Sequence, residues 1–136
     1  MANQRPKLRE ADVLRTYNDL DFCVPLIPPS VNHYVKHTRK GRHYVTPEAL
    51  AFKEAIPLCA KQRRVRHKFY AIEIYINLMD GQKLDLDNCA KVILDGLVEG
   101  GTIHSDAAVT GLYLHKKRGN RLAPSTCITI WEGKPV

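Results

Sequence analysis

The chain has 136 residues, of which 44% are hydrophobic and 26% are charged, and it carries a formal net charge of +7. This size and composition predict one globular domain with a single core. The chain has no run of 18 or more apolar residues, and its polar start lacks the apolar region of a secretory signal, so we expect a soluble cytoplasmic protein with no membrane contact.

The first predicted strand follows an N-terminal extension of uncertain structure, residues 1 to 20. It covers Phe22 to Ile27 and ends at Pro28-Pro29, since a proline cannot donate to an interior ladder. The next segment, Val31 to Val45, is basic and predicts a loop. Its histidines have no nearby Cys or acidic partner, so we expect solvated side chains rather than a structural metal site.

A helix is predicted to begin after Thr46, which is a suitable N-cap followed by Pro47 at the first helical position and Glu48 against the dipole. Pro57 is expected to end or kink this helix, and the segment from Cys59 to Arg66 is compatible with a continuation or a restart. The expected buried stripe consists of Ala51, Phe52, Ala55 and Ile56.

Residues 69 to 79 alternate between apolar and polar side chains and therefore predict a half-buried strand. Helical spacing follows from Leu86 to Val98, and Gly100-Gly101 predicts the end of that helix. Spacings of four would align Asp87, Lys91 and Asp95 as an exposed ion-pair ladder, which is the interpretation that we favour for Asp95.

Two further alternating segments, Val109 to His115 and Thr126 to Trp131, predict strands near the C-terminus. Gly119-Asn120 marks a turn, so we expect these strands to form a β-hairpin with a basic tip.

The cysteines at positions 23, 59, 89 and 127 contain no CxxC pair. This spacing does not match a zinc site or a redox motif, so we expect reduced core residues.

Charge is unevenly divided along the chain. Residues 31 to 68 hold ten Lys or Arg against two Glu, whereas residues 80 to 106 hold six Asp or Glu against two Lys. A second basic cluster begins at Lys116. The basic segments fit phosphate contacts along a nucleic-acid backbone, with ordinary solvated surface as the alternative.

The segment from Lys83 to Lys91 places Asp85 and Asp87 close together, and Asp106 follows fifteen residues after Lys91. Mg²⁺ is usually held by one or two carboxylates together with water and a substrate phosphate, so this pattern fits a hard-metal site. Capping of a helix by the same aspartates is the alternative, and the motif alone leaves both open. The pattern lacks the spacing of an EF-hand, a Walker loop or a GxSxG element.

The sequence DLDNCAKVILDGL at residues 85 to 97, followed by DAAV at residues 106 to 109, resembles the RusA family of Holliday-junction resolvases. Pro28-Pro29-Ser30, with Asn32 two residues later, resembles the PPSxN element of that family. The resemblance covers roughly residues 21 to 132. One departure is Ser105, which stands where many relatives carry a second acid.

This resemblance implies that Asp85, Asp87 and Asp106 are metal-binding and catalytic, with Lys91 as the catalytic lysine. The implied ion is Mg²⁺, with Mn²⁺ as an alternative. The implied protein is a bacterial or phage homodimer that binds four-way DNA junctions and resolves them by paired symmetric nicks, in DNA recombination and repair. The residues expected to contact DNA are Asn32, Lys36, Arg39, Lys40, Arg42, Lys83, Lys116 and Lys117.

The expected elements and the resemblance together predict an α+β (mixed α/β) endonuclease domain over residues 21 to 136, with a mixed four-stranded sheet packed against two main helices. Two alternative functions stay open. One is a basic nucleic-acid-binding module without catalysis, in which the aspartates only cap a helix. The other is a nuclease for other branched or duplex DNA.

Overall fold

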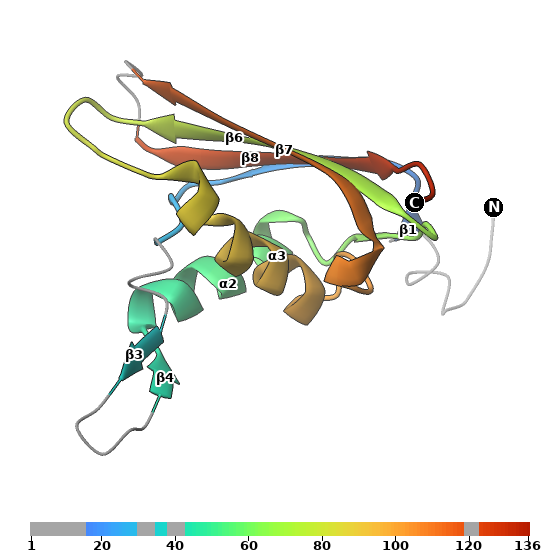
Figure 1. Cartoon of the computed structure of the whole chain (residues 1–136), viewed down its shortest axis with the longest axis horizontal. Helices are drawn as coiled ribbons and strands as arrows, with labels where there is room; N and C mark the ends of the chain where they lie inside the picture. The colour runs from blue at the N-terminus through green and yellow to red at the C-terminus, as the bar shows by residue number, and fades with distance from the viewer. Residues whose placement is uncertain (1–15, 30–34, 38–42, 119–122) are drawn as a thin grey trace.

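The structure is a computed structural model, and it describes residues 16–29, 35–37, 43–118 and 123–136. Its centre is a sheet in the order β2-β8-β6-β7. The helices α2 (Pro47–Cys59) and α3 (Ala90–Glu99) pack on one face of this sheet (Figure 1). The bounds of the strands are Leu20–Val24 for β2, Tyr70–Leu78 for β6, Val109–Arg118 for β7 and Ser125–Glu132 for β8. The predicted fold of a mixed four-stranded sheet with two main helices is confirmed.

Strand β6 lies in the interior of the sheet and pairs in parallel with β7 and antiparallel with β8. Its side chains alternate as the sequence predicts, because every second residue of a strand faces the same side. The side chains that face the helices are fully buried or nearly so, and they are Ile72, Ile74, Ile76 and Leu78.

The predicted hairpin of the last two strands is wrong. Strands β7 and β8 lie on opposite sides of β6, so they are not neighbours in the sheet. The reason is the connection through α3, which returns the chain so that β7 runs parallel to β6, as parallel neighbours require a crossover. The last strand, β8, then runs antiparallel between β6 and β2.

Helix α2 begins as predicted, with the Thr46 hydroxyl accepting a hydrogen bond from the Ala49 amide at 3.4 Å. The helix continues through Pro57 and ends at Cys59. The predicted buried stripe is wrong at one position, since Ala51 is exposed. The buried positions are Ala49, Phe52, Lys53 and Ile56.

Helices α2 and α3 approach each other closely where α3 carries a glycine. A Cβ atom at Gly96 would stand 2.5 Å from the Ile56 Cδ1 atom, so glycine permits this approach. The Lys53 ammonium of α2 also donates to both carboxylate oxygens of Glu99 at 3.0 Å, which ties α2 to the end of α3. These contacts hold the C-terminal half of α3 against α2.

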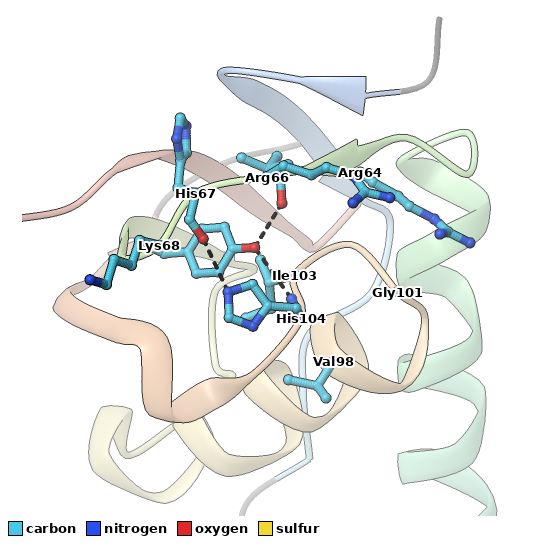
Figure 2. Close-up of a pocket in the computed structure, with 10 residues that line it drawn as sticks. Arg64, Arg66, His67, Lys68, Val98, Gly101, Ile103 and His104 are labelled. Atoms are coloured by element: carbon cyan, nitrogen blue, oxygen red, sulfur yellow. Dashed lines mark hydrogen bonds between the residues drawn. The ribbon is translucent and has the colours of Figure 1, made fainter. Parts of the chain in front are cut away.

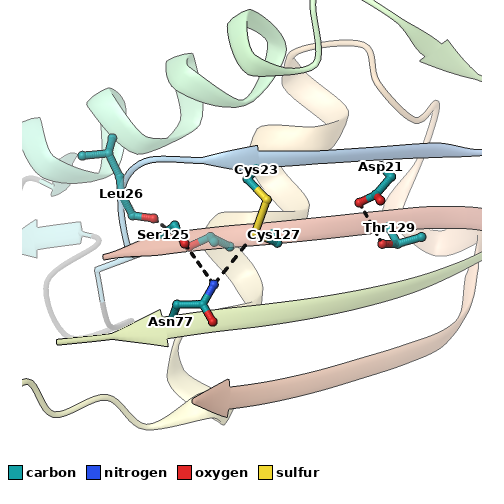
Figure 3. The surroundings of a disulfide bond; sticks show 8 residues. Asp21, Cys23, Leu26, Asn77, Ser125, Cys127 and Thr129 are labelled. Atoms are coloured by element: carbon teal, nitrogen blue, oxygen red, sulfur yellow. Dashed lines mark hydrogen bonds between the residues drawn. A yellow bond between two sulfur atoms is a disulfide. The ribbon is translucent and has the colours of Figure 1, made fainter. Parts of the chain in front are cut away.

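Cys23 and Cys127 form a disulfide between β2 and β8 (Figure 3). The expectation of reduced core residues is wrong for this pair. The two cysteines are directly opposite each other in the antiparallel register, and they lie on the sheet face that points away from the helices. The expectation of free thiols is confirmed for Cys59 and Cys89.

Short strands extend the fold beyond the central sheet. β1 (Thr16–Tyr17) pairs in parallel with β5 (Arg64–Val65), so the chain after α2 is extended and does not continue the helix. β3 (Val35–His37) and β4 (His43–Val45) form an antiparallel pair within the segment predicted as a loop. Among the described residues, no helix is both long and apolar enough to cross a membrane.

Candidate active site

The acidic motif lies between the end of β6 and the start of α3. Asp85 precedes a short 3-10 helix, η2 (Leu86–Asn88), and Asp87 lies within it. The predicted helix from Leu86 is therefore interrupted, and α3 begins only at Ala90. Both carboxylates are exposed.

Neither aspartate caps a helix with its side chain. No side-chain cap is found on η2 or at the start of α3, and the Asp85 carboxylate instead accepts a hydrogen bond from the side-chain Nδ2 of Asn88 at 3.5 Å. The capping interpretation, which the sequence left open, therefore does not account for these residues. Both carboxylates remain available to a ligand from solvent.

Basic side chains of β7 hold the loop that carries the motif. The Lys116 ammonium donates to the Leu84 carbonyl at 2.7 Å, and Arg118 donates to the Met79 carbonyl at 3.3 Å. The neighbouring Lys117 points to the other face of the sheet, where its ammonium lies 4.7 Å from the centroid of the Tyr75 ring. The two lysines of β7 that were predicted to bind DNA therefore face opposite sides of the sheet.

Cys89 fixes the motif to the core. Its thiol is buried and donates to the Leu86 carbonyl at 3.2 Å. Burial raises the pKa of the Cys89 thiol to about 11, with the Asp87 charge acting in the same direction and Lys116 opposing it. The charges of Asp87 and Lys116 therefore lie close enough to act on the same buried group.

Lys91 stands in the first turn of α3 with its side chain 63% exposed, and its ammonium pairs with Asp95 at 3.4 Å. This contact confirms the predicted pairing of Asp95. The predicted alignment of Asp87 with Lys91 on one helical face is altered, because Asp87 lies in η2 and not in α3.

Asp106 begins a second 3-10 helix, η3 (Asp106–Ala108), which leads into β7. The Ser105 hydroxyl caps η3 by accepting a hydrogen bond from the Ala107 backbone amide at 3.1 Å. Ser105, which stands where many relatives carry a second acid, therefore has a structural role. Figure 1 shows η2 at the start of α3 and η3 beyond its other end. Within one copy of the protein, Asp106 and the pair Asp85 and Asp87 therefore lie at opposite ends of α3.

The donor set at η2 fits a hard cation, since Asp85 and Asp87 offer exposed carboxylate oxygens two positions apart. Within the described ranges, no three Asp, Glu, His or Cys side chains are grouped closely enough to hold a metal ion. Two carboxylates with water and a substrate phosphate suffice for Mg²⁺. A ligand role for Asp106 stays a prediction.

The other residues predicted to bind DNA are only partly described. Lys83 is exposed in the loop before Asp85. The side chain of Lys36 lies outside the described residues, although its backbone belongs to β3. Asn32, Arg39, Lys40 and Arg42 also lie outside them.

A basic cavity of about 650 Å³ was missed by the sequence analysis (Figure 2). Its cationic lining residues are Arg64, Arg66 and Lys68, which follow α2. These residues belong to the basic segment of the chain. Their spacing of two positions was the sequence signal that could have placed them on one side of an extended segment. The other wall comes from the residues after α3, which could not be assigned to the same cavity without the fold.

Comparison with known proteins places this site in a family. The family described as endodeoxyribonuclease RusA matches residues 25–131, a range that includes both η2 and η3. A crossover junction endodeoxyribonuclease rusA from Enterobacteria phage HK97 is 25% identical over 92 residues, which cover 65% of this chain and 75% of that protein. Since the family match spans most of the sequence, the chain belongs to the endodeoxyribonuclease RusA family.

Proposed function

We propose that this protein is a Mg²⁺-dependent endodeoxyribonuclease that binds four-way DNA junctions as a homodimer and resolves them by paired nicks. The observation that carries the proposal is the exposed carboxylate pair Asp85 and Asp87, which caps no helix and directly precedes the helix that carries Lys91. The phage HK97 relative, named as a crossover junction endodeoxyribonuclease, supports the choice of a branched substrate.

In the proposed mechanism, Asp85 and Asp87 would hold Mg²⁺. The ion, when bound, would lower the pKa of the attacking water and offset the negative charge of the phosphate oxygens. Lys91 lies in the first turn of α3 with a side chain that is 63% exposed and an ammonium paired with Asp95. We expect this ammonium to orient the phosphate and to stabilise the charge that develops on it. The Asp95 contact restrains the Lys91 side chain, and Lys83 contacts a neighbouring backbone phosphate.

The proposed dimer follows from the symmetry of the substrate. A four-way junction has approximate two-fold symmetry, and a two-fold dimer offers equivalent sites to two opposing strands. The separation of Asp106 from the η2 carboxylates gives the second copy a further role. Among the described residues no third acid is grouped with Asp85 and Asp87, so we expect Asp106 to reach the site from the other copy or after a movement of η3. The Mn²⁺ ion, with similar oxygen preference, is expected to replace Mg²⁺.

A synthetic mobile junction and a linear duplex of the same sequence test this proposal. We expect Mg²⁺-dependent cleavage of the junction alone, and we expect Asp85→Asn to lose at least about 100-fold in cleavage rate while it keeps junction binding. Asp80→Asn is the matched control, since Asp80 is an exposed acid of the preceding loop that has no role in the proposed site. Asp106→Asn, assayed alongside, tests the third acid in the same way.

Other outcomes identify the alternative functions. Equal cleavage of junction and duplex would indicate a general nuclease. Junction binding without cleavage by the unaltered protein would indicate a binding module. Full activity of Asp85→Asn would remove Asp85 from the mechanism.

A further inference from the structure

The basic cavity between β5 and the end of α3 is built on a buried floor. Val65, Tyr70 and Ile103 line it and are at most 2% exposed. The Tyr70 hydroxyl donates to the Val65 carbonyl at 2.7 Å and accepts from the His104 amide at 3.3 Å. These bonds join the segment after α2 to the segment after α3, so the floor is fixed from both sides (Figure 2).

The rim of the cavity is cationic. Arg64, Arg66 and Lys68 are exposed, and none of the described residues that line the cavity is an Asp or Glu. In the described part of the chain, these three side chains form no ion pair. Three uncompensated cations around one concavity create a positive potential that attracts an anion.

The walls hold the rim in position. The Val65 amide donates to the Thr102 carbonyl at 2.9 Å, which binds β5 to the loop after α3. Gly101 has a φ of +77°, and a Cβ atom placed there would lie 3.8 Å from the Arg64 Nε atom, so the guanidinium packs over bare backbone. His104 closes the opposite wall, with its Nε2 atom donating to the His67 carbonyl at 3.0 Å.

The cavity lies at the opposite end of α3 from the carboxylate pair. Helix α3 has ten residues and is therefore roughly 15 Å long. A few nucleotides of a DNA strand span a distance of this order. A strand whose scissile phosphate lies at Asp85 and Asp87 can therefore present a second phosphate to this cavity.

We propose that the Arg64–Arg66–Lys68 cavity is a second phosphate-binding site, which holds the backbone of the DNA strand several nucleotides from the cleaved bond. The inference rests on the proposed function for the identity of the strand. The volume of about 650 Å³ exceeds that of a single phosphate and lies within the usual range for nucleotide-sized ligands. A free nucleotide carries the same phosphate chemistry, so the test has an arm for each source.

The test compares Arg64→Gln/Arg66→Gln with Lys61→Gln/Lys134→Gln, a control that removes the same charge from exposed lysines outside the cavity. Junction binding is measured by fluorescence anisotropy without divalent cations over a range of NaCl concentrations. We expect the slope of log K against log[salt] to become shallower by roughly two for the cavity variant, because each lost phosphate contact removes about 0.9. The control is expected to change the slope much less, and thermal unfolding checks that both variants fold.

An unchanged slope in the cavity variant, or an equal change in the control, would overturn the proposal. A second titration with deoxythymidine monophosphate tests the other source. The native protein could bind this nucleotide while the cavity variant does not, with the salt dependence of junction binding the same in both proteins. That result would assign the cavity to free nucleotides and overturn the proposed strand site. If the cavity variant has a shallower salt dependence of junction binding but the native protein cleaves no junction, the phosphate site is supported and the proposed resolvase function fails. If the native protein cleaves junctions but the salt dependence is unchanged in the cavity variant, the resolvase function is supported and the phosphate site fails.

Discussion

Cys89 joins the chemistry of the motif to the packing of the core. Its thiol is buried, two residues after Asp87, and burial raises its pKa from 9.0 to about 11. In the unfolded chain the same thiol ionises near its ordinary value. Folding therefore keeps a proton that the unfolded state releases, and this contribution to stability is complete below pH 9.

The free energy of unfolding is accordingly expected to fall as the pH rises from 9 to 11. The contribution of one thiol has a slope of at most about 1.4 kcal/mol per pH unit. Urea unfolding of the native protein and of Cys89→Ala measures it as the difference between two pH profiles. Cys59→Ala is the control, since Cys59 is the other free thiol and shows no such burial. Parallel profiles for the native protein and Cys89→Ala would contradict the assignment.

The disulfide between β2 and β8 closes a long loop of the chain. Its cysteines are 104 positions apart in the sequence, so the crosslink restricts the unfolded chain strongly. Reduction, or the double change Cys23→Ala/Cys127→Ala, is expected to cost about 2–4 kcal/mol of unfolding free energy.

Thermal unfolding with and without dithiothreitol measures this effect, and the double variant should be insensitive to the reductant. Alkylation of the unfolded, non-reduced protein should label two cysteines, Cys59 and Cys89. Labelling of all four, in protein kept under oxidising conditions, would contradict the crosslink.

Local patterns predicted several elements correctly because their signals lie within a few residues. The alternation of β6 and the Thr46 cap of α2 are examples. Neighbours in the sheet are not encoded locally, since alternation defines which face a residue occupies but not which strand lies beside it. For that reason the hairpin of β7 and β8 was predicted wrongly and the Cys23–Cys127 pair was missed.

The candidate site was predictable to a similar extent. The sequence identified Asp85, Asp87 and Lys91, which are close enough in the sequence to fall in η2 and the first turn of α3 or next to them. It could not place Asp106, whose distance from them depends on how the chain turns after Gly101. The cavity of Arg64 and its neighbours could not be predicted either, because its walls come from two separate segments of the sequence, residues 64 to 70 and 98 to 104.

The whole molecule distributes charge in a way that suits a metal-dependent enzyme of DNA. It carries a net charge of +7, yet six of its 14 Asp and Glu residues lie between positions 80 and 106, a segment that includes α3. Cations of the cavity and of β7 lie around them. In the proposed mechanism, the positive surface would attract the DNA backbone, and a divalent cation would offset the carboxylates where the strand approaches them.

The central proposal is paired, Mg²⁺-dependent cleavage of a four-way junction through the η2 carboxylates. The most direct measurement is the cleavage of a supercoiled plasmid that extrudes a cruciform. Two nicks made in one binding event give linear plasmid, whereas a single nick relaxes the supercoil, removes the cruciform and leaves a nicked circle. We predict linear plasmid with the native protein and Mg²⁺, and uncut plasmid with Asp85→Asn. Nicked circles from the native protein, or linear plasmid from Asp85→Asn, would contradict the proposal.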